Sequence, residues 1–98
     1  MNFEEFSNSL ASPFPPHKLS QALKALWYDA KGDWDTAHDM AQEDSGNEAA
    51  WVHAYLHRKE GDLSNANYWY QRAGQTMSSH SLKEEWVIVA RTLLEKCN

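Results

Sequence analysis

A short segment occurs twice in this chain, and this repetition constrains the fold more than any other feature of the sequence. Gly32-Asp33-Trp34-x-x-Ala37 returns 29 residues later as Gly61-Asp62-Leu63-x-x-Ala66. Each copy follows one apolar stretch with helical periodicity and begins another, so each marks the turn of a helical hairpin. Two consecutive hairpins of this kind predict a tandem repeat, in which neighbouring units bury their apolar faces against each other.

The first predicted hairpin covers residues 17–45. Its first helix, about residues 17–31, places its apolar side chains on one stripe at helical spacing, and Gly32 ends it. Asp33 is a suitable N-cap for a second helix that continues to about residue 43. The apolar faces of the two helices are formed by Leu19, Leu23, Leu26, Trp27 and Ala30 and by Trp34, Ala37, Met40 and Ala41.

The second predicted hairpin covers residues 48–76 and begins with a helix over about 48–60. Apolar residues lie on most of the circumference of this helix, which is typical of a helix contacted on several sides, so we expect it at the centre of the fold. Either Asp62 or Ser64 caps the helix that follows. The core face of that second helix comprises Leu63, Ala66, Trp69, Tyr70, Ala73 and, at its end, Met77.

An N-terminal segment, residues 1–16, precedes the repeat. Phe3, Phe6 and Leu10 have the spacing of a short amphipathic helix. The three prolines that follow cannot continue a helix, because proline lacks an amide hydrogen. They predict a linker that can pack through Phe14.

A last helix is predicted over residues 81–96. Ser81-x-x-Glu84 has the form of a capping box at its start. Repeat arrays need an end cap, and we expect this helix to cover the final apolar surface of the array. No segment has the alternating β-branched pattern of a strand. The sequence therefore predicts a single all-α domain over residues 1–98.

The repeated segment resembles the second helix of the tetratricopeptide repeat. The better match is Gly61-Asp62-Leu63-x-x-Ala66-x-x-x-Tyr70-x-x-Ala73. The preceding Trp51-Val52-His53-Ala54-Tyr55-Leu56 is similar to the first helix of that family, and Ala54 is the small residue that permits close helix approach. The resemblance covers about residues 19–76, with a 29-residue unit where the family usually has about 34. It implies that the first helices of the hairpins line a concave surface.

A second resemblance concerns a longer stretch. The string from Ala49 to Gly74, which includes Tyr68-Trp69-Tyr70, also resembles a small bacterial protein family. This resemblance implies no particular activity.

The charge of the chain limits the classes of partner. Nine basic and fourteen acidic residues give a formal net charge of −5, which argues against nonspecific binding to nucleic acid or anionic membranes. The first residues lack the basic and apolar regions of a secretory signal, and no window approaches a membrane span. The single cysteine, Cys97, cannot form an internal disulfide, so a reducing, cytoplasmic location is predicted.

The sequence contains no catalytic motif. It lacks a Gly-x-Ser-x-Gly elbow and a glycine-rich phosphate loop, and Cys97 is near the C-terminus, far from acid–base partners. Asp33 and Asp35 are a pair of carboxylates, but capping already explains Asp33. We therefore expect a protein without enzymatic activity and without a cofactor.

The leading functional hypothesis is binding of a protein or peptide by the helix over 48–60. Trp51, Tyr55 and Arg58 recur on one stripe of this helix, and Lys59 lies beside them. Aromatic and guanidinium groups dominate binding hot spots and pair well with carboxylates, so a partner with acidic groups fits this stripe. The alternative is that Trp51 and Tyr55 are core residues from which Arg58 extends to solvent.

A second partner surface is predicted on the following helix. Tyr68 and Arg72 are four residues apart and point away from the core face, as expected of a partner or dimer surface. The alternative is that these two side chains cover the terminal segment of the same chain.

The alternative to protein binding is a metal or small-molecule site. His53 and His57 are four residues apart on one helix, with Glu60 on the same side, and this spacing can direct two imidazoles at one ion. His38, His17 or His80 would have to supply a further ligand. The equivalent positions of the first copy are Lys24, Tyr28 and Lys31, which favours an ordinary solvated helix edge instead.

Overall fold

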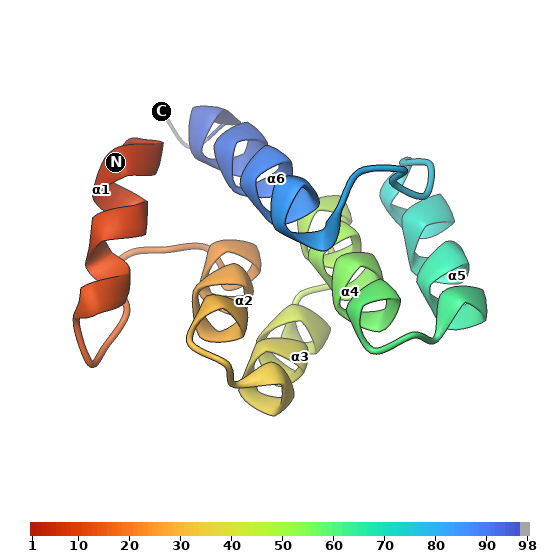
Figure 1. Cartoon of the computed structure of the whole chain (residues 1–98), viewed down its shortest axis with the longest axis horizontal. Helices are drawn as coiled ribbons and strands as arrows, with labels where there is room; N and C mark the ends of the chain where they lie inside the picture. Colours follow the sequence, from red (N-terminus) through yellow and green to blue (C-terminus); the bar gives the residue numbers. More distant parts are fainter. Residues whose placement is uncertain (97–98) are drawn as a thin grey trace.

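All regular secondary structure in the described part of the chain is helical, which confirms the predicted all-α class. The computed structural model describes residues 1–96, and no strand occurs within them. The elements in chain order are α1 (Phe3–Asn8), η1 (Ser9–Ala11), α2 (Gln21–Ala30), α3 (Trp34–Glu43), α4 (Asn47–Lys59), α5 (Leu63–Ala73) and α6 (Leu82–Lys96) (Figure 1). The helix predicted over 17–31 thus begins only at Gln21, because the side chain of Ser20 caps it by accepting a hydrogen bond from the amide of Leu23.

The two copies of the repeated segment form the same turn. Gly32 and Gly61 have φ angles of 84° and 89°, a left-handed conformation that glycine adopts without steric cost. Asp33 then accepts a hydrogen bond from the amide of Thr36, and Asp62 does the same for Asn65. The predicted helix end at Gly32 and the predicted N-cap at Asp33 are confirmed. Asp62, and not Ser64, is the N-cap of α5.

Helix α5 ends at Ala73, where Gly74 adopts a left-handed C-cap conformation with a φ of 74°. Met77 therefore lies beyond the helix, although its side chain still packs against the cluster formed by Ala54, Ala66 and Tyr70.

The four repeat helices pack as two adjacent pairs, α2 with α3 and α4 with α5, and α3 lies against α4 (Figure 1). Alanines allow the close approach: Ala25, Ala37, Ala54 and Ala66 are each 0% exposed. Helix α4 contacts α2, α3, α5 and α6, and this confirms that it is the central helix.

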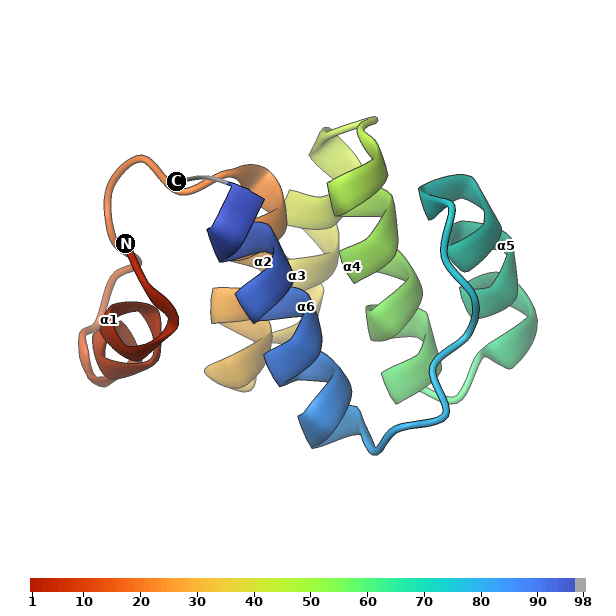
Figure 2. The ribbon, with the colours of Figure 1, turned by 90° about the horizontal axis from the view of Figure 1, so that it is seen from above.

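The C-terminal helix takes a different place from the one expected of an end cap. Helix α6 crosses α2 and α4, as Figure 2 shows, and it buries Val89, Ala90, Leu93 and Leu94 in the core that these helices share. The chain between α5 and α6 leads back across α4, so α6 covers the middle of the stack. The outer side of α5 therefore stays open, with Leu63 54% and Tyr68 53% exposed.

The N-terminal helix packs on α6. Phe6 is fully buried and stacks against the ring of Trp86 at 5.9 Å, and Phe3 meets the same ring edge-on at 6.1 Å. Phe14 is 76% exposed, so the proposed packing of the linker through this residue is wrong. Within residues 1–96, no helix has both the length and the apolar character needed to cross a bilayer.

Candidate functional site

Three histidines meet where α3 packs on α4. His38 comes from α3, and His53 and His57 come from successive turns of α4. Each offers one ring nitrogen to a set whose members all lie within 4.8 Å of one another. The Nε2 atoms of His38 and His53 are 3.0 Å apart, and the rings of His53 and His57 stack with their centroids 4.8 Å apart. We call these three residues the histidine cluster.

Two indoles hold the rings of the histidine cluster in place. Trp34 of α3 stacks on His38 with a centroid distance of 4.9 Å, and Trp69 of α5 stacks on His53 at 3.9 Å. The indole Nε1 of Trp34 donates a hydrogen bond of 2.9 Å to the carbonyl oxygen of Leu56, which fixes its ring. Three helices thus contribute to a cluster in which His53 and His57 are only 3% and 6% exposed.

A carboxylate orients one imidazole of the cluster. The Nδ1 atom of His57 lies 2.5 Å from Oε1 of Glu60. In the tautomer that donates from Nδ1 to Glu60, Nε2 carries the lone pair, and a carboxylate behind the ring is common for metal-ligating histidines. The side-chain amide of Asn65 lies 3.4 Å from that Nε2 atom. The two ring nitrogens of His57 thus contact Glu60 and Asn65, respectively.

His53 is the deepest member of the cluster and is kept uncharged. Burial, followed by the charges of His38 and His57, lowers its pKa from 6.5 to about 4. Its Nδ1 atom is buried and has no hydrogen-bond partner within the described residues. A neutral imidazole is the form that binds a metal ion, because protonation removes the lone pair.

The structure changes the set of ligands that the sequence suggested. It brings His53 and His57 together as expected, adds His38, and gives Glu60 a supporting contact through His57. A second group of closely spaced ligand atoms consists of His57, Glu60 and Asp62, of which the two carboxylates are exposed. In the part of the chain that is described, His17 and His80 belong to neither group.

His38 could not be chosen from the sequence alone, because it lies in the other hairpin, 15 residues before His53. One available signal was its spacing: Trp34 and His38 are one helical turn apart, as are His53 and His57. If the second helix of one hairpin stacks on the first helix of the next, these two pairs can face each other.

The predicted partner stripe on α4 is used inside the molecule. Tyr55 is 2% exposed, and its hydroxyl donates a hydrogen bond of 3.1 Å to the buried carboxylate of Asp29. Burial, together with the charge of Asp29, raises the pKa of Tyr55 far above its usual range. The Nζ atom of Lys59 lies 2.9 Å from the other oxygen of Asp29. Tyr55 is therefore a core residue, as the alternative to partner binding proposed.

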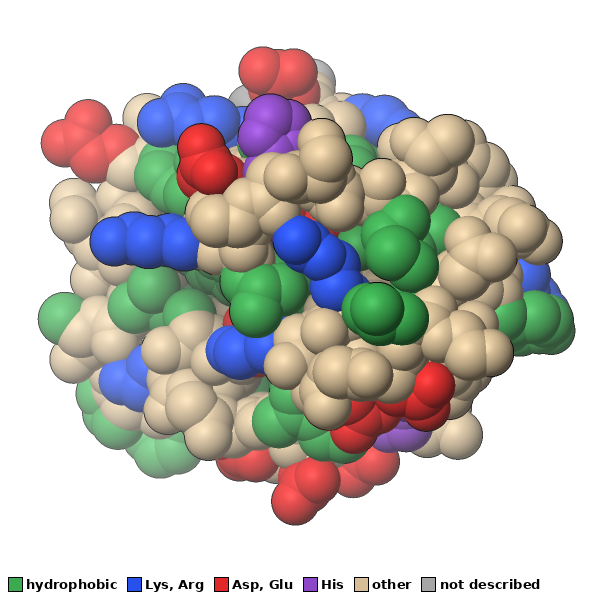
Figure 3. Space-filling model, turned by 45° about the vertical axis from the view of Figure 1, so that its right-hand side comes forward, with side chains coloured by type: hydrophobic (Ala, Val, Ile, Leu, Met, Phe, Trp, Pro, Cys, Tyr) green, Lys and Arg blue, Asp and Glu red, His purple; other side chains and the backbone are tan. Residues whose placement is uncertain are grey.

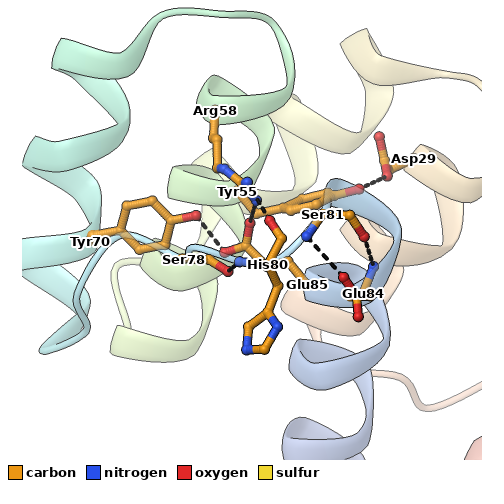
Figure 4. Close-up of polar contacts among 9 residues, drawn as sticks. All are labelled: Asp29, Tyr55, Arg58, Tyr70, Ser78, His80, Ser81, Glu84 and Glu85. Carbon is orange, nitrogen blue, oxygen red and sulfur yellow. Dashed lines mark hydrogen bonds and ion pairs between the residues drawn. The ribbon is translucent and has the colours of Figure 1, made fainter.

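Arg58 binds an acidic group from its own chain. Its Nη1 atom lies 2.7 Å from Oε1 of Glu85 in α6, and the guanidinium also donates to the carbonyl oxygen of His80 (Figure 4). The hydroxyl of Tyr70 donates to the second carboxylate oxygen of Glu85. The basic and aromatic stripe on α4 thus receives two carboxylates, as its chemistry suggests, Asp29 from α2 and Glu85 from α6.

The other predicted partner residues lie partly at the surface. Trp51 is half-buried and packs against the main core as well as against the cluster of Ala54, Ala66 and Tyr70. Tyr68 and Arg72 are exposed on α5, and both contact Trp69: the Tyr68 ring meets it edge-on at 5.3 Å and the Arg72 guanidinium lies 5.3 Å from its centroid. On the face drawn in Figure 3, hydrophobic and basic side chains lie across the middle, and acidic ones lie toward the upper and lower edges.

Comparisons of this chain with protein-family models, with curated proteins and with solved structures found no match.

Proposed function

We propose that this chain is a small metal-binding helical module whose ligands are His38, His53 and His57. The observation that carries the proposal is the convergence of three imidazole nitrogens within 4.8 Å at a packed junction of helices. A divalent ion of the first transition row, zinc above all, suits a set of imidazole donors.

The spacing of the nitrogens supports a single ion. Neighbouring ligand atoms on a tetrahedral zinc ion with bonds of about 2.0–2.1 Å lie about 3.3 Å apart. The Nε2 atoms of His38 and His53 are 3.0 Å apart. The other two separations in the cluster are at most 4.8 Å, so the ligand nitrogens would have to adjust by about 1.5 Å or less to surround one ion.

The surroundings of the cluster also favour a ligand role. Glu60 orients the ring of His57 through Nδ1, as outer-shell carboxylates do in metal sites. The lowered pKa of His53 keeps that ring neutral at pH 7, so an ion would not compete with a second proton on it. The proton that Nε2 of His38 and Nε2 of His53 share in their hydrogen bond would leave both atoms when the ion binds. Three protein ligands leave one position of a tetrahedral ion for water or an exogenous group.

The role that follows is a clip between the two helical pairs. An ion held by His38 of α3 and by two histidines of α4 would bind the folded chain and not the unfolded one. At a free zinc concentration 100 times the dissociation constant, such binding adds about 2.7 kcal/mol to the free energy of unfolding.

The test is zinc titration of protein prepared without a histidine tag. We expect one equivalent to bind with a dissociation constant below about 1 μM, and the cobalt form to show the visible absorption of a tetrahedral site. His38→Ala should lose this binding and the zinc-dependent stabilisation, while His17→Ala, outside the cluster, should keep both. Failure of the wild type to bind zinc or cobalt, or equal binding by His38→Ala, would refute the proposal.

Protein binding is the second candidate, and the open side of α5 favours it. Tyr68 is 53% exposed beside the exposed Arg72, on a helix that α6 leaves uncovered. Self-association through this side predicts a mass in light scattering that rises with concentration, and Tyr68→Ala should abolish the rise. A mass that stays constant with concentration would refute self-association through α5.

A further inference from the structure

A pocket lies on the side of α4 opposite to the histidine cluster, where four elements meet. Its volume is about 390 Å³, at the lower end of the range of about 300–1,000 Å³ that small-molecule sites occupy. The walls come from η1, the last turns of α2 and α4, and the first turns of α6. Its apolar side is formed mainly by Leu10, Leu82 and Trp86.

The polar side of the pocket is already organised. Asp29 and Tyr55, both buried, line it, and their side chains point toward each other in Figure 4. The ammonium group of Lys59 is held at the same carboxylate, 2.9 Å away. Even without a ligand, these contacts hold the Lys59 side chain at the pocket.

The charge of the pocket is opposite to that of the chain. Two lysines, Lys59 and Lys83, line it together with one carboxylate, Asp29, which leaves one positive charge uncompensated. Lys83 is exposed and forms no ion pair within residues 1–96. On a chain with a net charge of −5, a cationic rim beside an apolar wall selects an anionic group attached to an apolar body.

We propose that this pocket binds a small anionic amphiphile, namely a carboxylate with an aliphatic or aromatic tail. The headgroup pairs with Lys83 and with the solvent-facing side of Lys59. The tail lies against Trp86 and the two leucines and displaces water from them. Because the ligand touches η1, α2, α4 and α6 together, it stabilises the seating of α6 on α4.

The probe is octanoate, with octylammonium as the ligand of matched tail and opposite charge. Titration is followed by the indole Nε1–H resonance of Trp86 and by the backbone amides of Ala30 and Lys83. We expect saturable shifts with octanoate and much weaker ones with octylammonium. No saturable shift at millimolar octanoate, or tighter binding of octylammonium, would overturn the proposal.

Two variants and one control distinguish the contribution of the headgroup to binding from that of the tail. Lys83→Glu should weaken octanoate binding at least about fivefold, because it replaces an attraction by a repulsion. Ala30→Leu, at an exposed position that lines the pocket, should block the tail. Lys24→Glu has the same change of charge away from the pocket and should bind as the wild type does. Equal weakening by Lys24→Glu would show a general charge effect and refute the site.

Discussion

Two buried carboxylates have the same kind of environment in this fold. Asp29 contacts Lys59 and the hydroxyl of Tyr55, and Glu85 contacts Arg58 and the hydroxyl of Tyr70. Both carboxylates belong to residues that are 3% exposed. A buried charge is tolerated only when it is paired and its remaining lone pairs are satisfied, which a cation and a phenol achieve here.

Glu85→Ala should lower the free energy of unfolding by about 3–5 kcal/mol, because it leaves the largely buried Arg58 without its charge partner. It also removes the hydrogen-bond acceptor of Tyr70. Urea denaturation measures the effect. Glu95→Ala, at an exposed position of the same helix, should change stability by less than about 0.5 kcal/mol. A loss in Glu85→Ala as small as in this control would contradict the importance of the pair.

The capping box of α6 predicts a titration effect. The backbone amide of Ser81 donates to the carboxylate of Glu84 at 3.1 Å, and the Glu84 amide donates to the Ser81 hydroxyl at 3.1 Å. Hydrogen bonding to Ser81 lowers the pKa of Glu84 below 4.5. A carboxyl whose pKa is lowered by folding stabilises the fold above its unfolded pKa, and this contribution is lost as the pH falls through the folded value.

Ser81→Ala should therefore raise the pKa of Glu84 while leaving it below 4.5, because the backbone amide at position 81 remains a donor. Carbon-13 NMR of the carboxyl group measures this shift. An unchanged pKa would mean that the serine side chain does not contribute to the cap.

At the scale of elements, the two hairpin turns are nearly identical because their chemistry is local. A glycine with positive φ ends the first helix, and the aspartate after it caps the second helix through an amide three residues later. All of these interactions lie within a few residues, so the sequence alone was enough to locate both turns.

Gly61→Ala should destabilise the protein by about 1–2 kcal/mol, which is the cost of placing a residue with a Cβ in the left-handed region. An added Cβ would meet no atom within 4 Å, so backbone strain is the only source of this cost. Gly46→Ala is the matched control: its φ is −72°, and the new methyl would meet only the Asp44 side chain. Denaturation midpoints that are equal for the two variants would refute the assignment of strain to Gly61.

At the scale of the whole molecule, Trp86 joins three elements. Its indole Nε1 donates a hydrogen bond of 3.0 Å to the carbonyl oxygen of Leu26 in α2. The rings of Phe3 and Phe6 in α1 pack against its ring. Apart from the adjacent η1, the element that α1 mainly contacts is α6. This ring is therefore the main apolar contact of α1, while Arg91 on Phe3 and the hydrogen bonds from Trp27 and Lys31 hold the rest of the N-terminal segment.

Trp86→Ala should cost about 3–5 kcal/mol of stability and release α1. Hydrogen exchange of the amides in residues 3–8 should accelerate more than that of α4. Ile88→Ala, which truncates a 39%-exposed side chain of the same helix, should leave α1 protected. Unchanged protection of α1 in Trp86→Ala would show that another contact holds it.

The helices of the repeat, the caps at Asp33 and Asp62 and the central place of α4 followed from the sequence, because helix periodicity and capping depend on residues within about four positions of each other. The Ser20 cap of α2 did not, and that helix starts later than expected. The same information located His53 and His57 on one side of α4. It also showed that a carboxylate would suit Arg58.

Only the tertiary structure decided what meets these side chains. His38 joins the histidine cluster because α3 packs on α4, and Glu85 reaches Arg58 because α6 crosses the middle of the stack instead of its end. Such contacts depend on which apolar faces bury each other best, and several arrangements of the same helices satisfy the same local pattern. Local chemistry therefore specified the helices of this protein, and their packing specified its candidate sites.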